Sequence, residues 1–183
     1  MQSNLDKLLK KTITLLEKEN LDYFVIGGLA VGLLGEPRMT QDIDLIVFIS
    51  KDRIENFLKS ALVAGFKCNK VAVLDNVRNK GAFKLVWENL WVDVIIASTE
   101  FEASALKRTI KTKLLGKNIK IPSPEDFIIL KIIPGRDKDI SDVKSVIERQ
   151  KGKLDKKYLE NWAQRLSDEA EDMRIWNTLK KLL

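Results

Sequence analysis

Two aspartates that are two positions apart, Asp42 and Asp44, stand at the start of the apolar segment 42–49, which is typical of a buried strand. Because successive side chains of a strand point to opposite faces, both carboxylates project from one face and repel each other. A divalent cation between them would relieve that repulsion and bring a triphosphate with it. The spacing indicates an oxygen-ligated metal site. The alternatives are a structural cation site or a strand-entry pair bonded to loop amides.

A pair of glycines, Gly27 and Gly28, follows the short apolar run 23–26, which we predict to be a buried strand. Glycine has no Cβ, so the backbone at this point can approach a ligand closely. The segment 29–34 predicts a short helix, whose free N–H groups would favour an anion at its start. A tight turn with no catalytic role is the alternative.

A third acid, Asp93, lies in the otherwise apolar segment 90–97. Burying a charge without a partner is costly, so this aspartate requires a compensating cation. A metal ion shared with Asp42 and Asp44 would provide it. A buried arginine or lysine is the alternative.

The amino-acid composition excludes several other chemistries. The chain has no histidine and a single cysteine, Cys68, which excludes histidine-based catalysis, HExxH zinc sites and thiolate zinc clusters. A site built from oxygen ligands favours Mg²⁺ or Mn²⁺ over zinc. We expect Cys68 to be a small core residue rather than a reactive thiol.

The order of the strands and helices expected along the sequence predicts an α+β fold, with a mixed sheet in the first two thirds and helices at the end. The expected strands are 23–26, 42–49, 71–74, 82–87, 90–97, 108–115 and 119–121. The expected helices are 4–19, 29–34, 50–64, 99–106, one capped by Ser123 and ended by Pro134, 137–148, and two within 154–183. A two-residue turn at Glu88-Asn89 would join two of the strands.

Taken together, these residues resemble the DNA polymerase β-like nucleotidyltransferase superfamily. Its motif is a Gly-Gly or Gly-Ser pair, a gap similar to the thirteen residues found here, an Asp-x-Asp strand and a later acid on a neighbouring strand. The segment 38–44 resembles the Arg-x-Thr-x-Asp-hydrophobic-Asp pattern of the AbiEii-type group of minimal nucleotidyltransferases, which belong to abortive-infection and toxin–antitoxin pairs. Segments 122–126 and 136–142, with Lys131 between them, resemble the second block of that group.

The resemblance covers about residues 20–150. It implies a nucleotidyltransferase domain over residues 1–150, with a mixed-sheet core and an N-terminal helix, and a C-terminal helical extension, 151–183, packed on the same domain. The last thirty residues resemble no pattern that we recognise.

The resemblance also implies roles for particular residues. The acids Asp42, Asp44 and Asp93 would be catalytic and would bind two Mg²⁺ ions, with Mn²⁺ as an alternative. The nucleotide-binding residues would be Gly27, Gly28, Arg38, Thr40 and Lys131. For Arg38, an ion pair with Glu36 or Asp42 is an equally good interpretation.

The implied reaction moves a nucleoside monophosphate from a nucleoside triphosphate, such as ATP, to a hydroxyl of a protein or RNA acceptor, which could be a toxin partner. The alternative is a non-catalytic antitoxin or nucleotide-binding partner protein with the same fold. The net charge of +6 permits an anionic partner. A basic stretch could track an RNA backbone or form a solvated surface (Lys107, Arg108, Lys111, Lys113, Lys117 and Lys120).

No DNA or membrane partner is expected. The polar first residues and the lack of a long apolar run predict a cytoplasmic protein.

Overall fold

The computed structural model describes residues 3–183 and divides into two compact units. The first unit contains the chain up to Leu29 and Met39–Ile121, and the second contains Ala30–Arg38 and Pro122–Leu183. The first combines helices with a mixed sheet and the second is helical. The α+β prediction is therefore confirmed.

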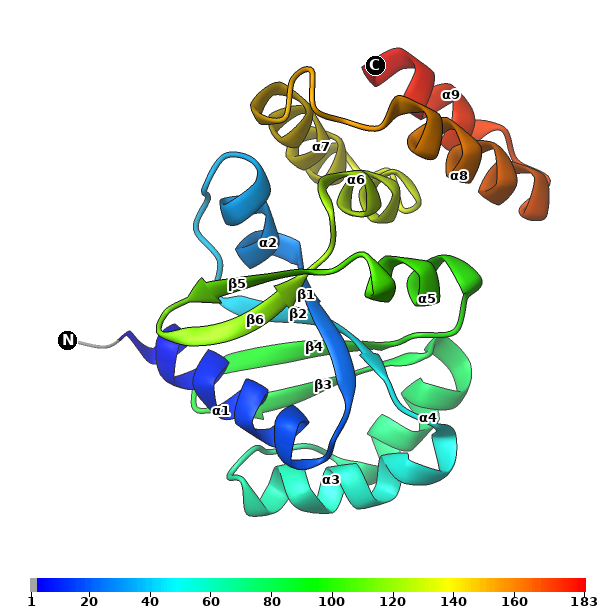
Figure 1. Cartoon of the computed structure of the whole chain (residues 1–183). Coiled ribbons are helices and arrows are strands. Elements are labelled where there is room, and N and C mark those ends of the chain that lie inside the picture. Colours follow the sequence, from blue (N-terminus) through cyan, green and yellow to red (C-terminus); the bar gives the residue numbers. More distant parts are fainter. Residues whose placement is uncertain (1–2) are drawn as a thin grey trace. The chain divides into compact units, whose positions relative to one another are not determined.

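The central sheet of the first unit has the strand order β1-β2-β4-β3. These strands are β1 (Asp22–Ile26), β2 (Asp42–Phe48), β3 (Ala82–Trp87) and β4 (Leu90–Ile96). The inner strands β2 and β4 are parallel, and the two outer pairs are antiparallel. A separate hairpin of β5 (Ile110–Leu114) and β6 (Lys117–Ile121) lies beside β1 (Figure 1).

One face of the central sheet is covered by α1 (Asn4–Lys18) and by α3 (Ile54–Val63), which follows the short 3-10 helix η1 (Lys51–Arg53) (Figure 1). The hydroxyl of Ser3 caps α1 by accepting a hydrogen bond from the backbone N–H of Asp6. From α3, Phe57 packs on Phe83 of β3 with ring centroids 6.2 Å apart. This apolar layer fixes which side of each strand is buried, and so which side can carry polar residues.

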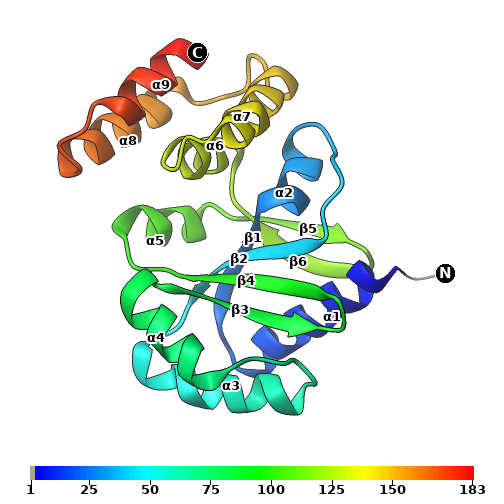
Figure 2. The same cartoon turned by 180° about the vertical axis from the view of Figure 1, so that it is seen from behind.

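On the other side of the sheet from α3 lies α5 (Glu100–Lys107) (Figure 2). It begins with a capping box in which Thr99 and Glu102 satisfy each other's backbone N–H groups. Phe101 is buried at its start. The predicted helix at 99–106 is thus confirmed within one residue at each end.

The segment 71–74, predicted as a strand, belongs instead to the helix α4 (Lys70–Lys80). The side chain of Asn69 caps its first turn, and Gly81 ends it with a φ of 62°. Val73 and Val77, four positions apart, form the buried face, while Val71 is 78% exposed. A four-residue apolar run does not distinguish a strand from a helix, and the caps on either side decide the outcome here.

The strands predicted at 82–87 and 90–97 are confirmed, and the turn between them is Glu88-Asn89. Cys68 is half-buried, and burial raises the pKa of its thiol, which disfavours the reactive thiolate.

The second unit contains the last part of α2 (Gly27–Leu34) and four further helices. These are α6 (Pro124–Ile132), α7 (Asp137–Arg149), α8 (Lys156–Glu169) and α9 (Arg174–Leu182). Ser123 caps α6, as predicted. The Tyr158 hydroxyl donates a hydrogen bond of 2.5 Å to the buried Asp126, which ties α8 to α6. Among residues 3–183, no helix has both the length and the apolar character that a membrane span requires.

Candidate active site

Three aspartates meet on one face of the central sheet of the first unit. Asp42 and Asp44 lie on β2, and the parallel register places Asp93 of β4 directly beside Asp44. One carboxylate oxygen from each of the three lies within 4.8 Å of the others. All three residues are half-buried, so their carboxylates are accessible to a ligand from solvent. The structure therefore brings together the three acids that the sequence singles out.

The donor set fits a hard divalent cation. Ligand oxygens of Mg²⁺ lie about 2.1 Å from the ion, so two of them on one ion are about 3–4 Å apart. The aspartate oxygens, within 4.8 Å of one another, reach that spacing with small side-chain rotations. Paired ions in two-metal sites are about 3.5–4 Å apart, and three carboxylates can hold either one ion or two. Asp42, Asp44 and Asp93 are the residues that would hold them.

Gly27 is required by the position of Asp44. Its φ is +64°, a conformation that favours glycine, and a Cβ on this residue would lie 1.8 Å from the Asp44 Oδ2 atom. Gly27 and Gly28 are both buried and begin α2, whose first-turn N–H groups have no partner within the helix. The glycine pair therefore places the start of a helix, where an anion is generally favoured, beside the Asp44 carboxylate.

Thr40 orients the first aspartate. Its hydroxyl donates a hydrogen bond of 2.5 Å to the Asp42 Oδ1 atom. The nucleotide contact that the resemblance implies for Thr40 stays a prediction, and the contact observed in the structure is with Asp42. That contact fixes the rotamer of a carboxylate that would otherwise be free to turn.

Asp93 has a lysine beside it, Lys84, as the alternative interpretation of this acid allowed, although that lysine is half-exposed rather than buried and the sequence analysis did not single it out. It lies opposite Asp93 in the β3–β4 pair, and its Nζ atom is 3.4 Å from Asp93 Oδ1. The same ammonium lies 4.8 Å from the centroid of the Trp91 ring. The predicted two-residue turn at Glu88-Asn89 could have revealed this pair, because the register of such a hairpin places position 84 opposite position 93.

Arg38 and Lys131 lie in the second unit, on buried acids. The guanidinium of Arg38 makes two hydrogen bonds, of 3.0 and 3.2 Å, to the carboxylate of Asp142. The ammonium of Lys131 is 2.9 Å from both Asp139 and Asp142. The partner of Arg38 is thus an acid 104 positions away rather than its sequence neighbours Glu36 or Asp42.

Asp139 is further bound by Arg136, whose Nε atom lies 2.6 Å from Asp139 Oδ2. Burial by itself would raise the pKa of Asp139, but the hydrogen bonds and charges of Arg136 and Lys131 outweigh burial and lower that pKa. The network therefore holds a buried carboxylate in its charged form.

We expect Lys131→Met to lower the free energy of unfolding by about 3 kcal/mol, because it leaves two buried carboxylates with fewer cations. Lys120→Met is the matched control, since Lys120 pairs with the exposed Asp22 at 2.8 Å and should contribute about 0–1 kcal/mol. Urea denaturation of both variants measures the difference. Equal losses would show that the Lys131 network does not stabilise the fold.

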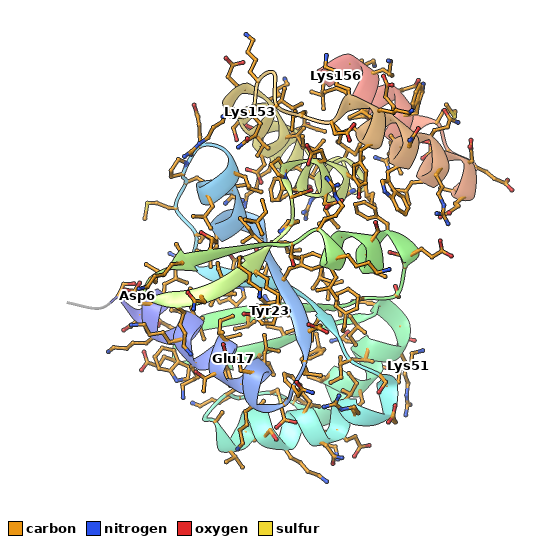
Figure 3. The ribbon with its side chains drawn as sticks, viewed as in Figure 1. Asp6, Glu17, Tyr23, Lys51, Lys153 and Lys156 are labelled. Atoms are coloured by element: carbon orange, nitrogen blue, oxygen red, sulfur yellow. The ribbon has the colours of Figure 1, made fainter. Side chains whose placement is uncertain are left out.

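A cleft of about 390 Å³ lies at the start of β1, among residues of α1, β5 and β6. Glu17 and Tyr23, which line it, are labelled in Figure 3. Burial first, and the charge of Glu17 second, raise the pKa of Tyr23 to about 12, so its hydroxyl stays protonated. Lys120, also in the lining, pairs with Asp22. The two acids of the lining, Glu17 and Asp22, are each paired with a lysine, Lys117 and Lys120, and do not form a cluster like that of the three aspartates.

The fold and the acid cluster together define a nucleotidyltransferase domain, and comparison with known families agrees. A family model described as "nucleotidyltransferase of unknown function (DUF6036)" matches residues 3–181. The chain belongs to this family. No curated protein matches the chain.

Solved structures share the fold at low sequence identity. The antibiotic-resistance factor ANT(2'')-Ia superposes with a TM-score of 0.62 at 13% identity, covering 93% of this chain and 97% of that one. The lincosamide antibiotic adenylyltransferase LnuA, with lincomycin bound, gives 0.53 at 13% identity, covering 79% and 96%. An antigenic nucleotidyltransferase-like protein from Paracoccidioides brasiliensis gives 0.53 at 20% identity, covering 98% and 94%. These likenesses establish the fold.

Proposed function

We propose that this protein transfers a nucleoside monophosphate from a nucleoside triphosphate to an acceptor hydroxyl, with Mg²⁺ bound by Asp42, Asp44 and Asp93. The observation that carries the proposal is the approach of their carboxylate oxygens to within 4.8 Å of one another. Beside them lies Gly27, where any residue with a Cβ would collide with the Asp44 carboxylate. Three carboxylates on one sheet face repel each other, and a triphosphate with its divalent cations supplies the compensating charge.

The residues of the chain divide the work between positioning and charge. The first-turn N–H groups of α2, at Gly27 and Gly28, bind phosphate oxygens. Thr40 holds Asp42 in the orientation required of a ligand. When bound, two Mg²⁺ ions would neutralise the developing charge on the phosphates, and Mn²⁺ could replace them.

The acceptor hydroxyl oxygen attacks the α-phosphorus in line with the departing pyrophosphate. A new bond forms between that oxygen and phosphorus, and the bond from the α-phosphorus to the bridging oxygen breaks. The carboxylate of Asp93 accepts the hydroxyl proton. Pyrophosphate leaves with the electron pair of the broken bond.

The predicted nucleotide contacts of Arg38 and Lys131 stay predictions. Lys131 has a side chain that is only 13% exposed, and both residues bind buried acids of the second unit. A variant of either residue should therefore be tested for stability before any loss of activity is interpreted as lost nucleotide binding.

Two acceptor classes have separate support. A small hydroxylated molecule is supported by the likeness in fold, over nearly the whole chain, to ANT(2'')-Ia, which was solved with adenylyl-2''-tobramycin, and by the likeness to LnuA. A protein or RNA acceptor, within a toxin–antitoxin or abortive-infection pair, is supported by the AbiEii-type resemblance and by the exposed Lys111 and Lys113 on the β5–β6 hairpin. The adenylyl group in the first comparison makes ATP the first nucleotide to test.

The test is pyrophosphate release with ATP, CTP, GTP or UTP and Mg²⁺, using α-labelled nucleotides to follow the label. Label on an aminoglycoside or lincosamide supports the small acceptor, and label on RNA or a protein supports the other class. Nucleotide binding by calorimetry with no pyrophosphate under any of these conditions would refute the transferase and favour the non-catalytic partner protein.

A further inference from the structure

The ammonium of Lys84 lies where it competes with a metal ion for Asp93. The cross-strand pairing of β3 with β4 puts the two residues directly opposite each other, with Nζ 3.4 Å from Asp93 Oδ1. The Trp91 ring, 4.8 Å away on the same strand as Asp93, provides a second contact that holds the ammonium over this face. Two contacts from one neighbouring strand therefore place the ammonium beside the acid cluster.

The three carboxylates are not equivalent because of this lysine. Asp42 has a neutral hydrogen-bond donor in Thr40, whereas Asp93 has a positive charge beside it. A divalent cation approaching Asp93 meets the repulsion of that ammonium and must displace it from the carboxylate. The Lys84 side chain is 50% exposed and can swing away at little cost.

We propose that Lys84 is a positioning residue that keeps its ammonium on Asp93 in the nucleotide-free protein, so that a cation binds tightly there only with the triphosphate. This inference rests on the proposed function of the three acids. The negative charge of the triphosphate offsets the repulsion from Lys84 and offers the released ammonium a new anionic neighbour. Binding of a cation at Asp93 is thereby coupled to nucleotide binding.

The experiment is a titration of the full chain with Mn²⁺ at low ionic strength, with free Mn²⁺ followed by electron paramagnetic resonance. It is run without nucleotide and with α,β-methylene-ATP, whose α–β linkage cannot be cleaved. Lys84→Met removes the charge and keeps the length of the side chain. Lys84→Arg keeps the charge and is the matched control.

Without nucleotide, Lys84→Met should bind Mn²⁺ about threefold to tenfold more tightly than the wild type, since one partly screened charge is removed near the ions. Lys84→Arg should match the wild type. With α,β-methylene-ATP the gap between Lys84→Met and the wild type should narrow. In an Asp93→Asn background Lys84→Met should have a smaller effect, because Asp44 lies one strand further from Lys84.

Several outcomes would overturn the inference. Equal Mn²⁺ affinity of the wild type and Lys84→Met would end it while leaving the proposed function in place. Equal tightening in Lys84→Met and Lys84→Arg would assign the effect to packing on Trp91 rather than to charge. If the wild type bound no Mn²⁺ in either condition, both this inference and the proposed function would be overturned. Mn²⁺ binding of unchanged affinity in an Asp42→Asn variant would have the same consequence.

Discussion

Replacing Asp44 by asparagine should lower nucleotide turnover by about three orders of magnitude, because the amide keeps the shape of the side chain and removes the charge that holds the cations. Asp42→Asn should have an effect of the same order, since both carboxylates lie on the same face of β2. Pyrophosphate release measures the loss, and circular dichroism with thermal melting checks that the fold persists.

Asp22→Asn is the matched control for these two substitutions. Asp22 is an exposed aspartate at the first residue of β1, the end of the strand away from Gly27, where it pairs with Lys120. Its activity should equal that of the wild type. Turnover within about threefold of the wild type in the Asp44→Asn or Asp42→Asn protein would remove the catalytic role proposed for these acids.

Gly27→Ala should lower turnover by about a hundredfold or more, because the new Cβ would displace the carboxylate that it meets at 1.8 Å. Some stability is also lost, since alanine at a positive φ costs about 1 to 2 kcal/mol. Turnover, Mn²⁺ affinity and urea denaturation of the variant should be measured together, because the collision with Asp44 should affect all three.

Gly81→Ala separates the two causes. Gly81 has a φ of +62°, close to that of Gly27, and a Cβ there has no heavy atom within 4 Å. Gly81→Ala therefore has only the backbone strain of alanine at a positive φ, without a collision, and should retain wild-type turnover. If both alanine variants lost activity to the same degree, the collision with Asp44 would not be the cause.

The chemistry of the site was predictable because it depends on local patterns. Period-two alternation placed Asp42 and Asp44 on one face, and the cost of a lone acid in an apolar strand singled out Asp93. The adjacency of β2 and β4 is a matter of sheet order, which no local pattern encodes. The resemblance to a known superfamily supplied that step.

The surroundings of the site were less predictable for the same reason. The pairing of Arg38 with Asp142 spans 104 positions, so neither local charge spacing nor helix periodicity could indicate it. The helix α4 was missed because its evidence lies in two end residues, Asn69 and Gly81, rather than in the apolar run between them. Lys84 was missed although the hairpin register was available, because an exposed lysine on an edge strand usually has no partner of consequence.

The close approach of Gly27 to Asp44 means that the residues at these two positions, seventeen apart in the sequence, constrain each other in evolution. A relative with any side chain at the first position cannot keep a carboxylate in this place at the second. Loss of the acid, in turn, releases the glycine from its steric constraint. Across the family, the residue at the first position should therefore distinguish members that retain catalysis from those that have decayed into binding proteins, before any of them is purified.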